Sequence, residues 1–269
     1  MATPVDNLLV EFRNVSYSVP TNSNPIISNL NLTVHEGETL VLLGESGCGK
    51  TTTLKLVNKL YLPTAGDVLV KNKPTTEWDS IALRRSIGYV IQEGGLFPHF
   101  TIARNVGLVP SLFKWDEQRI RSRVSELLTM VGLEPSRFAE RYPRELSGGQ
   151  RQRIGVARAL AADPALLLLD EPFGALDPLT RLSLQKEFAQ LTKKLGKTVI
   201  LVTHDVREAL LLGDRIALMH AGEIVVLETP QGFVSSQNEK VKAYMDTLEV
   251  AGSRDRENQP TPDREEETI

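Results

Sequence analysis

Apolar and polar positions predict strands at both ends of the chain. Residues 8–15 have the pattern of one strand, and residues 30–34 alternate with a period of two, as a half-buried strand does. Other runs are almost entirely apolar, which is typical of strands buried on both faces of a parallel sheet. We therefore expect a small antiparallel sheet beside a parallel one. The buried strands are expected at 39–43, 87–92, 165–170 and 198–203, and a hairpin at 215–227.

The middle of the chain has a helical pattern instead. Residues 117–131 place their apolar positions on one face, after the capping residue Asp116 and before the stop Gly132. Because this helical block lies between a β-rich start and a βα end, we expect a separate helical lobe at about 95–163. Other helices are expected at 101–109, 150–162, 178–195 and 205–212.

One stretch carries a specific chemical signal. After the apolar run at 39–43, residues 44–51 match G-x-x-x-x-G-K-[ST], and a helical pattern follows. Glycines let successive backbone N–H groups turn toward an anion, and the helix that opens near Gly49 adds its positive end. Lys50 can then reach the β- and γ-phosphates of a nucleotide, and the Thr51 hydroxyl can ligate Mg²⁺. The predicted nucleotide-binding residues are Gly44, Glu45, Ser46, Gly47, Cys48, Gly49, Lys50, Thr51 and Thr52.

Composition narrows the class of protein. The 269 residues suffice for one large domain, expected over 8–250, and the polar segment 251–269 is read as an acidic disordered tail. A net charge of −3 gives no basic footprint, so nucleic acid is not an expected partner, and the single cysteine, Cys48, excludes an intrachain disulfide. No apolar run reaches the ~18 residues that span a bilayer, and residues 1–7 show no signal-peptide pattern. We therefore expect a soluble, cytoplasmic chain whose membrane role would come through a partner.

Two carboxylates follow a buried strand. The apolar run at 166–169 ends in Asp170 and Glu171, and a strand that delivers a carboxylate beside a phosphate loop is how such sites hold Mg²⁺. Asp170 is the expected metal partner, mostly through water. Glu171 points differently, one residue further on, and is free to polarise an attacking water. A plain strand-end acidic pair that caps a helix is the alternative.

Three further features are expected near a nucleotide. Residues 147–150 open a helix with a serine and two glycines, a second anion site of the same physical kind as the first. Because one nucleotide needs one cradle, we expect this one to serve the nucleotide of another copy. His204 is expected to bond the γ-phosphate or the attacking water, and Gln92 to sense Mg²⁺ or water. Each feature has an alternative when it is taken alone. Residues 147–150 could be an ordinary helix N-cap, His204 a histidine without a functional role, and Gln92 a solvated glutamine. The second cradle consists of Ser147, Gly148, Gly149 and Gln150.

Six motifs in order resemble those of an ATP-binding-cassette ATPase, the cytoplasmic motor of an ABC transporter. The resemblance spans roughly residues 8–250 and implies an α/β P-loop cassette. Its parts would be a RecA-like core, an N-terminal antiparallel β subdomain and an inserted α-helical subdomain. The motifs are Walker A at 44–51, the Q-loop at Gln92, the signature at 146–150, Walker B at 166–171, the D-loop at 174–177 and the switch histidine at His204.

The resemblance also implies roles and ligands. ATP and Mg²⁺ are the implied ligands, and Tyr17 falls where this family stacks an aromatic ring on adenine. The implied metal residues are Thr51, Gln92 and Asp170, and the implied catalytic residues are Glu171, His204 and Gln92.

Partners follow from the same resemblance. Two cassettes would form a head-to-tail homodimer, with each ATP between residues 44–51 of one copy and 147–150 of the other. ATP would have to prefer the closed dimer in order to close it. Members of the family act with integral membrane permease subunits and, indirectly, with a substrate-binding protein. The chain is therefore expected at the cytoplasmic face of the inner (plasma) membrane, as a peripheral subunit.

Residues 83–99 are the most informative about the substrate. Within them, residues 83–92 and 95–99 resemble importer cassettes for quaternary amines such as glycine betaine, choline and carnitine, whereas Glu93 and Gly94 differ from the glutamine-rich pattern usual there. Asn105, Val109 and Pro110 continue the likeness. The expected function is the ATP-hydrolysing subunit of an osmoprotectant importer. Such relatives often carry a C-terminal pair of regulatory CBS domains, for which this chain ends too soon. The alternatives are an importer cassette for amino acids, methionine or polyamines, a non-transport cassette ATPase, and a small-molecule kinase.

The loop at 96–98 is unusually apolar for a loop. Beside Gln92, it could line a cleft that receives a short helix of the membrane subunit and so link the ATP state to the pore. Packing between the two lobes is the alternative.

Overall fold

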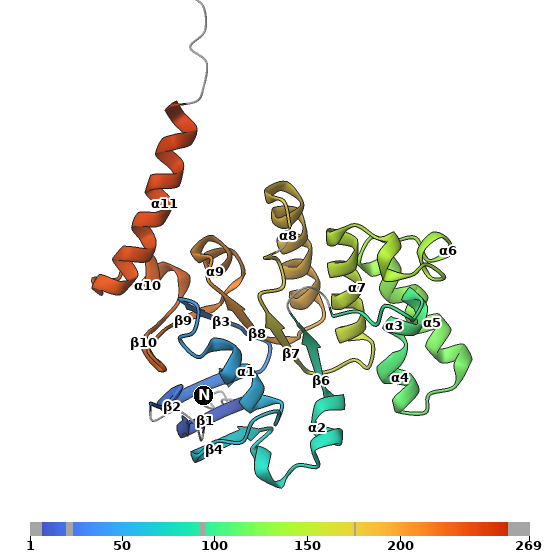
Figure 1. Cartoon of the computed structure of the whole chain (residues 1–269), viewed down its shortest axis with the longest axis horizontal. Coiled ribbons are helices and arrows are strands. Elements are labelled where there is room, and N and C mark those ends of the chain that lie inside the picture. Colours follow the sequence, from blue (N-terminus) through green and yellow to red (C-terminus); the bar gives the residue numbers. More distant parts are fainter. Residues whose placement is uncertain (1–6, 20–23, 92–94, 175, 258–269) are drawn as a thin grey trace, which may run out of the picture.

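The computed structural model describes residues 7–19, 24–91, 95–174 and 176–257, with side chains to residue 248. The predicted site residue Gln92 and one residue of the D-loop, Ala175, lie outside the described residues. Within the described ranges the chain forms two sheets with helices around them (Figure 1).

The smaller sheet is antiparallel and comes from the first part of the chain. Its strand order is β2-β1-β4-β5, with β1 paired to β2 on one side and to β4 on the other. The predicted antiparallel sheet is therefore confirmed, and β1 runs two residues beyond the predicted end. The strands are β1 (Leu8–Tyr17), β2 (Ile27–His35), β4 (Ala65–Val70) and β5 (Lys73–Pro74).

The larger sheet holds the buried apolar strands. Its order is β10-β9-β3-β8-β7-β6, and all its pairs are parallel except the β9–β10 hairpin. The sequence predicted the hairpin, and the structure adds that it extends the parallel sheet. The strands are β3 (Thr39–Gly44), β6 (Ile87–Val90), β7 (Leu166–Asp170), β8 (Thr198–Thr203), β9 (Arg215–His220) and β10 (Glu223–Glu228).

Alternation along the buried strands divides the core into two halves. In β3, Leu40 and Leu42 pack on the side of the small sheet and helix α1 (Lys50–Val57), whereas Val41 and Leu43 pack on the opposite side. The helices on that opposite side are α7 (Gly148–Leu160), α8 (Pro178–Lys194) and α9 (Val206–Leu212). Strands β7 and β8 alternate in the same way. All of these side chains are buried, as expected for a parallel sheet covered on both faces.

Helices between β6 and β7 form the predicted helical lobe, on the right of Figure 1. The short helix after Thr101 was predicted to end before Pro110, and it ends at Val106. A second helix, α4, then begins at Leu108 and holds Pro110 in its first turn, where proline is tolerated. The lobe comprises α3 (Ile102–Val106), α4 (Leu108–Leu112), α5 (Glu117–Met130), α6 (Pro135–Phe138) and α7 (Gly148–Leu160), with a 3₁₀ turn at Pro143–Glu145.

Helices α8 and α9 cover the same face of the larger sheet as α7, and α2 packs beside β6. Helix α11 begins against α9 and α10, and its far end projects away from the sheet (Figure 1). The ordered chain was predicted to end at about residue 250, but α11 continues to Glu257. No proline interrupts the chain between Pro230 and Pro260, so a helix can continue there. These helices are α2 (Ser80–Ser86), α8 (Pro178–Lys194), α9 (Val206–Leu212), α10 (Pro230–Val234) and α11 (Glu239–Glu257), with a 3₁₀ turn at Thr75–Glu77.

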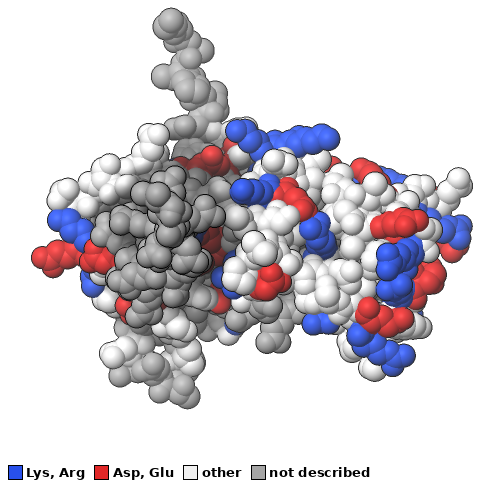
Figure 2. Space-filling view, turned by 90° about the horizontal axis from the view of Figure 1, so that it is seen from above, with Lys and Arg blue, Asp and Glu red and all other residues white. Residues whose placement is uncertain are grey.

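Charged side chains are mixed on the surface of the helical lobe. Figure 2 shows acidic and basic groups interspersed there, on the right of the view. Neither sign dominates the described part of this face.

Candidate nucleotide site

The phosphate loop connects β3 to α1, in the predicted order of strand, loop and helix. Gly49 precedes the helix with a φ of 109°, a conformation that L side chains rarely adopt, and a Cβ there would lie 2.6 Å from Cδ1 of Ile27. The Lys50 ammonium is buried and donates to the carbonyl oxygens of Gly44 (2.7 Å) and Glu45 (2.8 Å). The loop therefore gathers a cation and the positive end of a helix at one point, which suits a polyphosphate.

Parallel pairing brings the second motif to the same edge of the sheet. β8 pairs with β3 and β7 so that Leu43 lies opposite Thr203 and Asp170 opposite Val202. The Thr51 hydroxyl donates to Oδ1 of Asp170 at 2.8 Å, although the two residues are 119 positions apart. The structure therefore brings together two of the predicted metal residues.

The environment of Asp170 favours a bound cation. Burial raises the pKa of this carboxyl, and the hydrogen bond from Thr51 opposes the rise. A metal ion beside it would favour the charged carboxylate in the same way as Thr51 does.

The donors fit Mg²⁺ in chemistry. The described residues contain no group of three or more histidine, cysteine, aspartate or glutamate side chains that could hold a metal alone. Mg²⁺ characteristically keeps several waters and is held by one or two protein oxygens together with substrate phosphates. The Thr51 hydroxyl and the Asp170 carboxylate supply that kind of oxygen set.

Glu171 stands at the end of β7 in an unusual conformation. Its φ is 46°, in the left-handed region, and its N–H donates to the carbonyl oxygen of Val202 at 3.0 Å. This turn brings Oε2 of Glu171 to 3.3 Å from Nδ1 of His204. Residues other than glycine are strained in the left-handed region, and such strained residues cluster at functional sites. The predicted catalytic pair, from two different strand ends, is thus adjacent in the structure.

A pocket of about 550 Å³ opens beside this pair. One of its walls is helix α11, which was not predicted from the sequence to be part of the site. Helix α11 contributes Tyr244 opposite the phosphate-loop residue Glu45. Burial raises the pKa of Tyr244 to about 12, with Glu45 adding to the rise. The signal for this helix was the i, i+3, i+4, i+7 spacing of apolar residues that pack on the core. These are Val241, Tyr244, Met245 and Leu248.

The signature residues form a helix cap. The Ser147 hydroxyl accepts the N–H of Gln150 (3.2 Å), and Oε1 of Gln150 accepts the N–H of Ser147 (3.0 Å), which is a capping box for α7. A Cβ on Gly149 would lie 2.9 Å from Cγ2 of Thr180, so this segment borders the start of α8. α7 and α1 pack on opposite faces of the larger sheet. Among the hydrogen bonds of the described residues, none joins the signature to the phosphate loop of the same chain.

Tyr17 is stacked on another side chain. Its ring lies parallel to that of Tyr61, with the ring centroids 5.0 Å apart and the planes at 8°. One face of the predicted adenine-stacking ring is therefore covered by protein, so a base could stack only on the other face.

A buried acid that the sequence did not reveal, Glu208, lies against Thr203, the residue before His204. Glu208 of α9 is buried and accepts hydrogen bonds from the Thr203 hydroxyl and from Nε2 of Gln185 (3.3 Å). Burial raises the pKa of Glu208 from 4.5 to about 7, and Asp205 adds to the rise, while the two hydrogen bonds and Arg181 oppose it. A glutamate five residues beyond the end of a strand carries no pattern that would reveal such burial.

Strand, phosphate loop, helix and adjacent carboxylate together define a P-loop nucleotide-binding cassette. The sequence profile of the ABC transporter family matches residues 27–174. The chain belongs to the ABC transporter family.

Relatives and solved structures agree with this assignment. The chain is 52% identical over 220 residues to the osmoprotectant import ATP-binding protein OsmV of Salmonella typhimurium, covering 81% of this chain and 58% of that protein. It is 55% identical over 204 residues to the choline transport ATP-binding protein OpuBA of Bacillus subtilis, covering 76% and 53%. The chain thus spans little more than half the length of these relatives.

The fold agrees with a solved cassette as well. The dimeric ATP-binding cassette MJ0796, bound to ADP and Pi, superimposes with a TM-score of 0.74 at 38% identity, covering 82% of this chain and 98% of that one. The predicted α/β P-loop cassette, with its antiparallel subdomain and its helical subdomain, is confirmed.

The buried Glu208 leads to a prediction about stability. Because its pKa is about 7 in the folded chain and 4.5 is its ordinary value, the unfolded chain ionises first as the pH rises. Stability is therefore lost between about pH 4.5 and pH 7, by roughly 3 kcal/mol at ~1.4 kcal/mol per pKa unit. Glu208→Gln removes this loss, so its free energy of unfolding, relative to the parent, should rise between about pH 4.5 and pH 7 in urea titrations and level off above that range. Glu117→Gln, at an exposed carboxylate, is the control, and parallel pH curves for Glu208→Gln and the parent would contradict the prediction.

Proposed function

We propose that this chain binds ATP with Mg²⁺ and hydrolyses it as the motor subunit of an importer. The observation that carries the proposal is the meeting of Thr51 with Asp170 at 2.8 Å and of Glu171 with His204 at 3.3 Å, at one edge of the sheet. A phosphate loop alone implies a nucleotide, whereas a carboxylate beside it adds a means to activate water.

Each residue of this edge has a distinct task. Lys50 and the N-terminus of α1 neutralise charge on the β- and γ-phosphates. Thr51 and Asp170 would hold Mg²⁺, which supplies further charge neutralisation when bound. Glu171 orients the attacking water and accepts its proton. His204 holds Glu171 in place and would bond the γ-phosphate. Hydrolysis then depends mainly on position and electrostatics.

The second anion cradle is proposed to act on the nucleotide of another copy. Helices α7 and α1 pack on opposite faces of the sheet, which supports use of residues 147–150 in trans. The solved cassette with which this chain superimposes is itself a dimer. Leu179, at the start of α8 beside the signature, is 83% exposed in the single chain, as expected of an apolar side chain that a second copy would cover.

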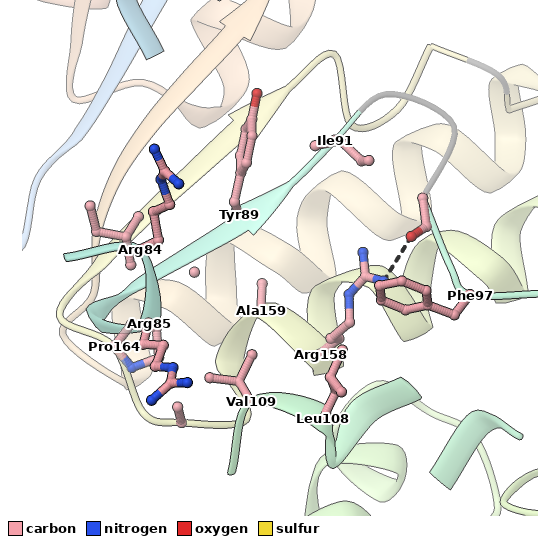
Figure 3. A pocket seen from close by; sticks show the side chains of 14 residues that line it. Arg84, Arg85, Tyr89, Ile91, Phe97, Leu108, Val109, Arg158, Ala159 and Pro164 are labelled. Carbon is pink, nitrogen blue, oxygen red and sulfur yellow. Dashed lines mark hydrogen bonds between the residues drawn. The ribbon is translucent and has the colours of Figure 1, made fainter. Parts of the chain in front are cut away.

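A groove between the two lobes suits a permease segment. It has a volume of about 300 Å³, and Figure 3 shows Phe97, Leu108 and Val109 along one side and Tyr89 and Ile91 along another. Its lining also includes Arg84, Arg85 and Arg158. Arg84 and Arg158 donate to the carbonyl oxygens of Lys59 and Gly95, and the positive charge that the three arginines bring to the groove favours a segment with acidic side chains.

The apolar loop in this groove is rigidly held. Asn105 is completely buried and bonds the backbone of Phe97 twice, at 2.8 and 3.1 Å, and the carbonyl oxygens of Phe100 and Thr101. Phe97 is nevertheless 46% exposed. A buried amide that fixes an exposed aromatic ring supports docking rather than packing between lobes as the purpose of this loop.

Osmoprotectants are the proposed cargo of the transporter. The names of the relatives above include osmoprotectant and choline transport, and a third, from Bacillus subtilis, is a glycine betaine/carnitine/choline transport ATP-binding protein at 49% identity. Within the described residues, no helix is long and apolar enough to cross a bilayer. We place the chain at the cytoplasmic face of the plasma membrane, held there by permease subunits and served indirectly by a substrate-binding protein.

Hydrolysis provides the first test. Glu171→Gln keeps the shape of the side chain but removes its basicity, so turnover of ATP should fall by ~10²-fold or more while the affinity for ATP stays within a few fold. Phosphate release and nucleotide binding measure the two quantities. Glu117→Gln makes the same chemical change at an exposed site and should be neutral. Near-normal turnover by Glu171→Gln would rule out its proposed role.

The signature provides the second test. Ser147→Arg places a bulky cation at the start of α7, so hydrolysis should fall to background while each single chain still binds ATP at its own phosphate loop. Ser125→Arg, at an exposed position on α5, is the matched control. Undiminished hydrolysis by Ser147→Arg would contradict a site shared between two copies.

Transport provides the third test. Phe97→Asp puts a charge into the apolar side of the groove, so uptake of labelled glycine betaine and choline should be lost while ATP binding is kept. Val234→Asp changes a similarly exposed residue on α10, at the other end of the sheet, and should transport normally.

Uptake is compared in cells with and without the gene, at high and low osmolarity, with methionine and a polyamine as further substrates. Betaine and choline uptake that does not depend on the gene would contradict the proposed cargo.

A further inference from the structure

Arg181, in the first turn of α8, joins two segments that flank the catalytic pair. Its Nη2 donates to the carbonyl oxygens of Gly174 and Leu176, both at 3.1 Å. Its Nη1 lies 3.6 Å from Oδ2 of Asp205. Arg181 and Asp205 are each about one-third exposed, at 32% and 31%, so water screens this ion pair only in part.

Each end of this bridge leads directly to a catalytic residue. The N–H of Gly174 donates to the carbonyl oxygen of Glu171 at 3.4 Å. Asp205 follows His204 in the chain, and its N–H donates to the Thr203 hydroxyl at 3.0 Å. Because Glu171 and His204 are themselves 3.3 Å apart, the contacts form a closed ring through Arg181.

The chemistry of arginine suits this position. A planar guanidinium can bond two carbonyl oxygens and a carboxylate at the same time, which a lysine ammonium on a flexible stem does less well. Asp205 has a second task, since its Oδ1 accepts the N–H of Arg207 at 2.8 Å and caps α9. Glu171 lies in a left-handed conformation that persists only where its surroundings hold it.

We propose that Arg181 is a positioning residue for ATP hydrolysis, which holds the D-loop carbonyls and Asp205 together so that Glu171 and His204 stay within hydrogen-bond reach. The inference rests on the proposed role of Glu171. Arg181 acts through these neighbours and touches no reacting atom. A small displacement of a catalytic pair is costly, because a misplacement of about 1 Å can lower a rate by about 10²-fold.

Steady-state kinetics of Arg181→Met test the inference. We expect kcat to fall by ~10-fold or more, while KM for ATP and the midpoint of thermal unfolding change little, because the phosphates are held mainly by Lys50 and the start of α1, which lie outside this ring. Arg181→Lys should recover part of kcat, since it keeps the charge. Arg207→Met is the matched control, because that exposed arginine lies two residues from Asp205 and should leave kcat unchanged.

A double-mutant cycle with Asp205→Asn tests the ring itself. Asparagine caps helices as well as aspartate does, so this variant weakens the bridge and preserves α9. Asp205→Asn alone should lower kcat at constant KM, which gives an independent test should Arg181→Met fail to fold. The double variant should be no slower than Arg181→Met, whereas independent effects would multiply to ~100-fold.

Three results would overturn the inference. They are an unchanged kcat in both single variants, multiplicative effects in the double variant, and a loss of kcat matched by an equal loss in Arg207→Met. A parallel assay of Glu171→Gln separates the two claims. If Glu171→Gln is inactive and Arg181→Met is normal, only the inference fails, whereas normal turnover by Glu171→Gln removes the proposed function on which it rests.

Discussion

The register in which β7, β8 and β3 pair is the constraint on which the site depends. With Asp170 opposite Val202 and Leu43 opposite Thr203, three strands end at the same level, so the phosphate loop, the Asp170–Glu171 pair and His204 emerge together. A shift of one residue in β7 would turn Asp170 to the other face of the sheet and away from Thr51. Core packing prevents such a shift, because Leu166 and Leu168 face one hydrophobic half of the core and Leu167 and Leu169 face the other.

Electrostatics then decide what this edge can bind. The Lys50 ammonium and the start of α1 provide positive charge for phosphates, while Asp170 is a buried carboxyl whose pKa is raised by that burial. A cation beside Asp170 relieves the cost of burying its charge. Phosphate and a metal ion at this edge would therefore favour each other's binding, and Glu171 and His204 would remain at the rim, where a water could reach them.

Much of this arrangement was predictable from local patterns. The apolar runs gave the strands of the larger sheet, and the motif at 44–51 gave the loop, because the glycines and the lysine act within one short segment. The pairing of Thr51 with Asp170 was predictable from the rule that parallel strands present their ends at one edge. Gln92 and the D-loop residue Ala175 lie outside the described residues, so their roles stay predictions.

What could not be predicted depends on contacts between distant segments. Arg181, Asp205 and Glu208 look like ordinary helix residues, and their importance appears only when α8 and α9 are packed together. Likewise, α11 joins the pocket because its apolar stripe meets the core far from it in sequence, and its extent was underestimated because its last residues are polar. The stack of Tyr17 on Tyr61 joins β1 to the segment after α1, which no local pattern encodes.

The central claim is that one chain holds the nucleotide by its phosphates and that a second copy completes the site with residues 147–150. Sedimentation of the Glu171→Gln chain with Mg²⁺, at increasing concentrations of ATP, tests it most directly, because this variant should bind ATP without consuming it. The account predicts the mass of one chain without ATP and of two chains with ATP. When the Ser147→Arg substitution is combined with Glu171→Gln in the same chain, it predicts the mass of one chain even with ATP. A Glu171→Gln chain that binds ATP yet sediments as a single chain at every ATP concentration would contradict the account.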